Sequence, residues 1–205
     1  MISEGAKIWA LVPVKRFDQA KQRLSDVLDA QERATLARTM LSDVLHAIAD
    51  VQELAGIAVI TDDGTAAQIA RSFSARVLGD PAYGGTNVAV ASGMTKLRDA
   101  GADAVLVVPG DIPLVRPSDL RACLLARRYA PIVLAPASRD GGTNMLLQDC
   151  AANFSPAFGP DSFARHLAMA RAARVPVGLV LRARICMDID RPADALEGVA
   201  GNLRE

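Results

Sequence analysis

The feature that most constrains the fold of this chain is the alternation of short apolar runs with segments of helical periodicity. Residues 104–108 (AVLVV) are the clearest strand, because an uninterrupted apolar run of this length is typical of a strand covered on both faces. Residues 31–49 show the other pattern, with apolar side chains recurring at helical spacing. Further strands are predicted at 8–14, 57–61, 76–78, 132–135, 144–147, 177–181 and 185–187, and further helices at 65–73, 87–100, 117–128, 162–173 and 192–198. This order predicts an α/β fold with a mostly parallel sheet and helices on both faces.

The length and the charge of the chain indicate how many domains it has and which kinds of partner are not expected. The 205 residues contain no repeat, linker or low-complexity segment, so we expect a single domain over 1–205. Lysine plus arginine equals aspartate plus glutamate, at 23 each, which gives no reason to expect nucleic acid or an anionic membrane as a partner. No apolar run approaches the roughly 20 residues of a membrane span, and the first residues do not resemble a signal peptide. Three widely spaced cysteines are expected to be reduced thiols in the cytoplasm.

Charged residues follow several of the predicted strands. Lys15 follows the first strand, Asp62 the second, Asp111 the strand at 104–108 and Asp188 the last. In open α/β sheets, ligands bind beyond the carboxyl ends of the strands. We therefore expect these four side chains to gather along one edge of the sheet.

The loop after the first strand is strongly basic. Lys15, Arg16, Lys21 and Arg23 lie within nine residues. Such side chains hold phosphate groups through charge-assisted hydrogen bonds, and a nucleotide's phosphates lie at this loop in doubly wound sheets. The segment contains no glycine, so it is neither a P-loop nor a GxGxxG turn. A solvated basic turn is the alternative, and the spacing does not separate the two.

Three carboxylates are candidate magnesium ligands. Asp111 sits in VPGDIPL, where two prolines stiffen the turn, and Mg²⁺ takes one or two carboxylates together with substrate phosphates. Asp188 and Asp190 alternate in an extended segment and therefore face the same side. The alternatives are helix caps, with Asp111 capping the helix at 117–128 and Asp190 the helix at 192–198.

Two further segments combine glycine with small polar residues. In Asp140-Gly141-Gly142-Thr143-Asn144 the glycines let backbone amides approach a ligand, although Asp-Gly is also a common hairpin turn. In FGPDSF, Gly159 and Ser162 lie at the expected start of a helix, where anions bind, and Ser162 is alternatively the helix cap. His166 is expected to pack against this helix start rather than to act in catalysis, and His46 is expected to be structural.

Five segments together resemble one family, the guanylyltransferases of coenzyme F420 biosynthesis. The matching segments are PVKRFDQAKQRL, VPGDIPLV, DGGTNMLL, FGPDSF and MDIDRPADAL, in the family's order and over nearly the whole chain. The resemblance implies the nucleotide-diphospho-sugar transferase type of fold. It also implies a reaction that joins GTP to a phosphorylated three-carbon acid and releases pyrophosphate, with 2-phospho-L-lactate, phosphoenolpyruvate and 3-phospho-D-glycerate as candidate acids.

The resemblance also implies roles for single residues. Lys15, Lys21 and Arg23 are implied triphosphate contacts and catalytic residues, and Asn87 is an implied nucleoside contact. Asp111, Asp188 and Asp190 are implied Mg²⁺ ligands, with Asp111 also contacting GTP and acting in catalysis. Thr143, Gly159 and Ser162 are implied contacts to the acid. The oligomeric state is left open, with a homodimer among the candidates.

Two positions depart from the family pattern, and other functions compete with the resemblance. Thr86 replaces a usual leucine, and Asp161 replaces a usual glycine beside the expected acid site. A molybdenum-cofactor or sugar-phosphate nucleotidyltransferase usually opens with a glycine-rich loop, which is missing here. A non-catalytic nucleotide sensor would need the basic loop without the carboxylates. A phosphatase of the haloacid dehalogenase type needs an aspartate on the first strand, and residues 8–14 have none.

Overall fold

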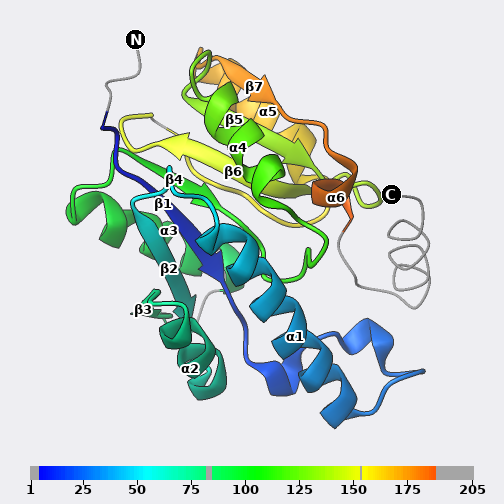
Figure 1. Cartoon of the computed structure of the whole chain (residues 1–205). Coiled ribbons are helices and arrows are strands. Elements are labelled where there is room, and N and C mark those ends of the chain that lie inside the picture. The colour runs from blue at the N-terminus through cyan, green and yellow to red at the C-terminus, as the bar shows by residue number, and fades with distance from the viewer. Residues whose placement is uncertain (1–4, 82–84, 153, 188–205) are drawn as a thin grey trace.

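The computed structural model describes residues 5–81, 85–152 and 154–187, and its strands form one sheet. The strands are β1 (Ile8–Pro13), β2 (Gly56–Thr61), β3 (Arg76–Gly79), β4 (Ala104–Val107), β5 (Ile132–Pro136), β6 (Thr143–Asp149) and β7 (Val177–Leu179). Their order across the sheet is β3-β2-β1-β4-β6-β5-β7 (Figure 1). Only β6 runs against its neighbours β4 and β5, and the other described pairings are parallel. The sheet is therefore mostly parallel, as the sequence predicts.

Helices cover both faces of the sheet (Figure 1). They are α1 (Ala30–Ala49), α2 (Gly64–Ser72), α3 (Gly85–Asp99), α4 (Pro117–Ala126), α5 (Ser162–Ala172) and α6 (Ala183–Cys186), with short 3-10 helices η1 (Phe17–Gln19) and η2 (Gln22–Leu24) in the basic loop. One hydrophobic cluster joins α1, α2, α4 and α6 to one face, and a second joins α3 and α5 to the other. No helix among the described residues is long and apolar enough to cross a membrane.

The central strands are apolar on both sides because both faces are covered. In β1, Ala10 and Val12 belong to one cluster and Leu11, between them, to the other. A strand with alternate side chains in two cores must be apolar throughout, which explains the unbroken runs in the sequence. The rigid pairing of β1 with β2 and β4 fixes the positions at which the following loops begin.

The end of the described chain differs from expectation. Residues 185–187 are predicted as a strand, but Ile185 and Cys186 belong to the single helical turn α6. The Arg184 side chain donates to the buried carboxylate of Asp119 at 2.9 Å, and the Asn144 side chain donates to the Ile185 carbonyl at 2.8 Å. These long-range contacts, rather than a local pattern, hold the turn. The helix predicted at 192–198 lies outside the described residues.

Candidate active site

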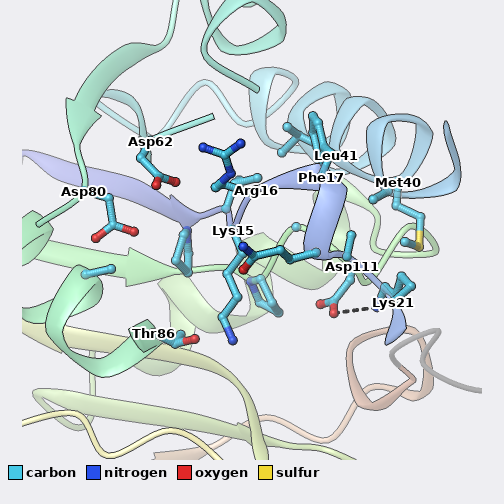
Figure 2. Close-up of a pocket in the computed structure, with 18 of the residues that line it drawn as sticks. Lys15, Arg16, Phe17, Lys21, Met40, Leu41, Asp62, Asp80, Thr86 and Asp111 are labelled. Carbon is cyan, nitrogen blue, oxygen red and sulfur yellow. Dashed lines mark hydrogen bonds and ion pairs between the residues drawn. The ribbon is translucent and has the colours of Figure 1, made fainter. Parts of the chain in front are cut away.

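A cavity of about 630 Å³ opens at the carboxyl ends of the parallel strands (Figure 2). Lys15 follows β1, Asp62 follows β2, and Asp111 lies beyond β4; all three line this cavity, together with Asp80 after β3 and Thr86 in α3. The predicted gathering of Lys15, Asp62 and Asp111 at one sheet edge is confirmed. Asp188, the fourth expected member, lies outside the described residues, as does Asp190.

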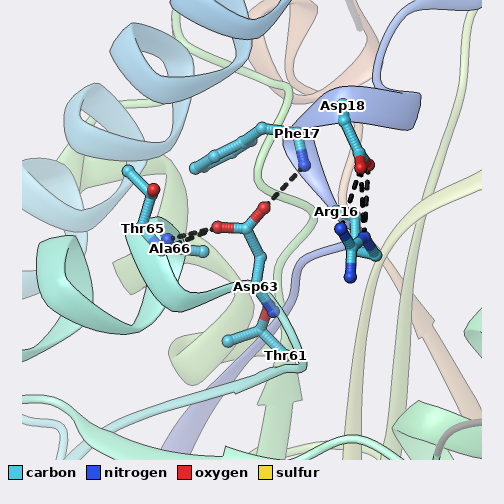
Figure 3. A network of polar contacts seen from close by, with 7 residues as sticks. All are labelled: Arg16, Phe17, Asp18, Thr61, Asp63, Thr65 and Ala66. Carbon is cyan, nitrogen blue, oxygen red and sulfur yellow. Dashed lines mark hydrogen bonds and ion pairs between the residues drawn. The ribbon is translucent and has the colours of Figure 1, made fainter.

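The basic loop is anchored by a buried aromatic residue. Phe17 is 5% exposed, and its backbone N–H donates to Asp63 Oδ2 at 2.9 Å (Figure 3). The other Asp63 oxygen accepts from the backbone of Thr65 and Ala66 and so caps α2. One carboxylate therefore fixes both the helix after β2 and the loop after β1. Sequence analysis missed this role of Asp63, although an aspartate directly before Gly64 is a typical capping signal.

Two charged side chains join the basic loop to the end of β4. Lys21 Nζ donates to Asp111 Oδ2 at 2.8 Å, and the Lys21 side chain is only 6% exposed against 36% for that of Asp111 (Figure 2). Lys21 also has a left-handed backbone, with φ at 50°. Such a conformation is uncommon for a residue other than glycine and persists where surrounding contacts impose it. Asp111 thus has a cationic partner that sequence spacing did not suggest.

Asp111 does not cap the following helix. The residue before α4 is Arg116, and its backbone N–H donates to Asp119 Oδ2 at 3.0 Å. The capping alternative for Asp111 is therefore wrong, because the N-cap position belongs to Arg116 and the Asp111 carboxylate accepts from Lys21 instead. The Asp111 carboxylate instead faces the cavity.

The opposite part of the cavity has two carboxylates and one cation, Arg16, which lies beside Asp62 (Figure 2). Asp62 and Asp80 lie together at the ends of β2 and β3, away from Lys21 and Asp111 (Figure 2). Partial burial, and then the nearby charge of Asp62, raise the pKa of the Asp80 carboxyl. Lys15 extends between the two parts, with its side chain directed toward Thr86 in this view. The cavity is therefore electrostatically polarised, and Asp80 is a lining residue that sequence analysis missed.

The second predicted half of the site is built on the hairpin between β5 and β6. The Ala137 N–H donates to the Gly142 carbonyl at 2.9 Å, so the Asp140-Gly141 segment does form a hairpin turn. Because β6 is antiparallel to β4, the first residue of β6, Thr143, lies at the same sheet edge as the carboxyl end of β4. The hairpin tip and the cavity therefore share one edge.

Ser162 connects the hairpin to α5. Its fully buried hydroxyl oxygen accepts from the Thr143 N–H at 2.8 Å. The residue at the N-cap position is Asp161, and Ser162 is the first residue of the helix, so the capping alternative for Ser162 is wrong. Asp161 has φ at 55°, the left-handed region that glycine adopts freely and aspartate tolerates. A glycine would adopt this backbone conformation without strain.

His166 is a buried, neutral packing residue, as predicted. Its Nε2 accepts from the Ala157 N–H at 2.8 Å, and its Nδ1 lies 2.9 Å from Thr143 Oγ1. Burial, and then the charge of Arg165, lower the pKa of His166 to about 4.

His46 is structural as well, since its ring packs edge-on against Phe73. Burial also raises the pKa of all three cysteine thiols, which are free.

Three further predicted site residues do not line this cavity. Arg23 is exposed in η2, and Gly159, with φ at 125°, turns the chain before α5. Asn87, in the first turn of α3, is hydrogen-bonded to the backbone of Phe158 at 2.7 and 3.0 Å. The contacts to substrate assigned to these residues stay predictions.

Comparison of folds places the chain in a class. A solved structure from Desulfovibrio desulfuricans G20, described as a "putative nucleotide-diphospho-sugar transferase", superposes with a TM-score of 0.78, covering 97% of this chain and 88% of that one at 18% identity. At this identity the likeness concerns the fold alone. The chain belongs to the family described as Guanylyl transferase CofC like, whose model matches residues 8–201. It is therefore a guanylyltransferase.

Two relatives are similar over almost their whole length. A phosphoenolpyruvate guanylyltransferase of Conexibacter woesei is 39% identical over 188 residues, which is 91% of this chain and 84% of the relative. A 3-phospho-D-glycerate guanylyltransferase of Phenylobacterium zucineum is 37% identical over 195 residues, which is 94% of this chain and 89% of the relative. The two relatives differ in the acid that their names give.

Proposed function

We propose that this enzyme transfers GMP from GTP to the phosphate of a three-carbon acid and releases pyrophosphate, in coenzyme F420 biosynthesis. The observation that carries the proposal is the convergence of Lys15, Lys21 and Asp111 on one cavity in a chain of this family. The names of the two relatives make phosphoenolpyruvate and 3-phospho-D-glycerate the first acids to test, with 2-phospho-L-lactate as the third.

The polarity of the cavity suggests how GTP lies in it. The triphosphate is anionic, so it is attracted by Lys15 and Lys21, whereas Asp62 and Asp80 repel it and outnumber the single cation beside them, Arg16. The phosphates then occupy the part near the basic loop, with the nucleoside toward the ends of β2 and β3. Thr86, in the first turn of α3, lines that second part.

The acid is proposed to bind on the hairpin side, at Thr143 and at the exposed turn of Gly159, while the fully buried Ser162 supports this part from behind. Supporting this, Thr143 begins β6 at the same edge as Asp111, and Ser162 holds its backbone at 2.8 Å. An acid seated there lies beside the phosphate end of GTP rather than beside its base. That arrangement suits a reaction between two phosphate groups.

The transfer needs positioning and charge neutralisation more than proton transfer. A phosphate oxygen of the acid attacks the α-phosphorus of GTP, a new P–O–P bond forms, and the bond to the β-phosphate breaks with its electron pair leaving on pyrophosphate. The attacking phosphate is already ionised at neutral pH, so no general base is required. The neutral, buried His166 fits this scheme. Lys15 and Lys21 stabilise the negative charge on the transferring and departing phosphates.

Mg²⁺ is part of the proposal, and it would share the Asp111 carboxylate with Lys21, whose ammonium group bonds one of its oxygens. The Asp111 carboxylate is partly exposed toward the cavity, and Mg²⁺ is typically held by one or two carboxylates plus substrate phosphates. The described residues contain no cluster of three or more metal-ligating side chains. Asp188 and Asp190, which lie outside the described residues, are the further ligands that the family resemblance implies. When bound, the ion would neutralise charge on the phosphates.

Incubation of the enzyme with GTP, Mg²⁺ and each acid in turn tests the proposal. Pyrophosphate release should depend on one of the three acids, and mass spectrometry should find the matching guanylyl diphosphate. ATP and CTP in place of GTP serve as nucleotide controls. Absence of a guanylylated acid with all three would overturn the proposal, and release of pyrophosphate without any acid would indicate hydrolysis instead.

A further inference from the structure

Asn87 makes a two-point contact with a distant loop. Its Nδ2 donates to the Phe158 carbonyl at 3.0 Å, and its Oδ1 accepts from the Phe158 N–H at 2.7 Å. The amide therefore satisfies both backbone groups of one residue, 71 positions away in the chain. Thr86, its neighbour in α3, lines the cavity, whereas Asn87 does not. The Asn87 amide is already engaged before any nucleotide binds.

The loop that Asn87 holds is the one that carries the proposed acid contacts. Phe158 directly precedes Gly159, whose carbonyl accepts from the Ser162 N–H at 3.1 Å. On the other side of Phe158, the Ala157 N–H donates to His166 Nε2. The Phe158 ring also packs edge-on against the His166 ring, with centroids 5.5 Å apart. Phe158 thus connects Asn87 to the buried end of α5.

His166 continues the connection to Thr143. Because Nε2 accepts a backbone hydrogen bond, the neutral ring carries its proton on Nδ1 and donates it to Thr143 Oγ1, 2.9 Å away. The Thr143 hydroxyl then acts as acceptor in this bond and keeps its own proton for another acceptor. A carboxylate or phosphate oxygen of the acid is an acceptor of that kind. A continuous set of contacts therefore runs from Asn87 through Phe158 and His166 to Thr143.

We propose that Asn87 is a positioning residue for the acid half of the site, holding the loop at Phe158 and Gly159 against α3. This inference rests on the proposed function, because it needs the acid to bind at the Gly159 turn. It assigns Asn87 a different role from the nucleoside contact implied by family resemblance. The two roles predict opposite kinetic effects, because one concerns the acid and the other GTP.

The test is the variant Asn87→Ala, with Val88→Ala as matched control on the same exposed turn. We expect Asn87→Ala to raise KM for the acid about 3- to 10-fold, the effect of losing one or two hydrogen bonds that position a loop. KM for GTP and the preference for GTP over ATP should stay at the wild-type values. Val88, which is 42% exposed, should be replaceable without a change in either KM.

Hydrogen exchange supplies a readout independent of activity. In Asn87→Ala the Phe158 amide should exchange faster, while core amides of β1 and β4 keep their protection. In Asn87→Asp the acceptor for that amide remains, so protection and the KM for the acid should fall between those of the wild type and Asn87→Ala. A rise in the KM for GTP alone, or unchanged protection of Phe158, would overturn the inference. A wild-type enzyme that transfers no GMP would instead defeat the proposed function.

Discussion

Lys21 Nζ lies 2.8 Å from Asp111 Oδ2, and this pair closes the basic loop onto the end of the central strand β4. The lysine is almost completely buried although it belongs to a loop. Its left-handed backbone shows that the loop is shaped to bring the ammonium group to this carboxylate. The strained backbone of Lys21 and the position of its ammonium group therefore go together. Substitutions can test the effect of the strain and the effect of the charge separately.

Lys21→Ala and Lys21→Gly should have equal effects on turnover and different effects on stability. Both remove the ammonium group, so we expect kcat to fall about 10²-fold or more, as for loss of one electrostatic stabiliser. Glycine relieves the left-handed strain, so Lys21→Gly should be more stable than Lys21→Ala by about 1 kcal/mol. Turnover and chemical denaturation of the two variants measure these effects. Recovery of turnover in Lys21→Gly would show that loop shape, not charge, matters.

Asp111→Asn should lower kcat roughly 10²-fold or more, because the carboxylate that pairs with Lys21 and is proposed to hold Mg²⁺ becomes neutral. The wild-type enzyme in EDTA should likewise be inactive, and adding Mg²⁺ should restore it. Initial rates across a Mg²⁺ titration are the measurement. Full activity of Asp111→Asn, or of wild type in EDTA, would exclude the metal role.

Lys15→Ala should abolish or greatly reduce turnover while the melting temperature stays near that of the wild type. Lys15 is exposed, and the loop is anchored by Phe17 instead. Arg98→Ala is the comparison, since its guanidinium pairs with Asp99 at 3.2 Å on the surface, does not line the cavity and should matter less. A collapse of the melting temperature in Lys15→Ala would indicate a structural lysine and contradict the phosphate assignment.

Ser162→Ala should affect stability and acid binding together. Removing the hydroxyl leaves the buried Thr143 N–H without its acceptor, which should cost about 1–3 kcal/mol of unfolding free energy. Because Thr143 is a proposed acid contact, KM for the acid should also rise while KM for GTP stays unchanged. Denaturation curves and kinetics with each substrate varied in turn test both parts. Equal shifts in the two KM values would count against separate pockets.

Burial of His166 should make stability depend on pH. Its pKa is lowered from 6.5 to about 4, so between these values the unfolded chain binds a proton that the folded protein excludes. The free energy of unfolding therefore has its full value above pH 6.5. It declines as the pH falls toward 4, by an amount on the order of 3 kcal/mol. Denaturant unfolding at several pH values measures it. His166→Gln should lose this part of the pH dependence, and an unchanged profile would assign it to other groups.

The sequence predicted those features that depend on local pattern. Apolar runs revealed the strands, and the residues after those runs were then placed at the sheet edge by topology alone, as the cavity around Lys15, Asp62 and Asp111 confirms. Asp80 was missed because the strand before it, β3, is short and ends in a glycine rather than in an evident apolar run.

The contacts that complete the site join residues far apart in sequence. Lys21 and Asp111 are 90 residues apart, and Asp119 and Arg184 are 65 apart. No periodicity or motif specifies such a partner, so the ion pair at Asp111 and the helical turn α6 could not be derived. The capping alternatives for Asp111 and Ser162 failed for the same reason, because each side chain is engaged by a distant element instead.

Because β6 runs antiparallel to β4 and β5, the two halves of the site differ in how well they tolerate changes in sequence. The nucleotide half is built from strand-to-helix connections, whose course is tied to the packing of α1, α2 and α3. The hairpin half ends in a surface turn over 137–142, and turns of this kind accept insertions and exchanges while the paired strands behind them stay in register. On the proposed assignment of the two halves, acceptor preference in this architecture can therefore diversify by exchange of a surface turn, while the donor-binding half is inherited intact.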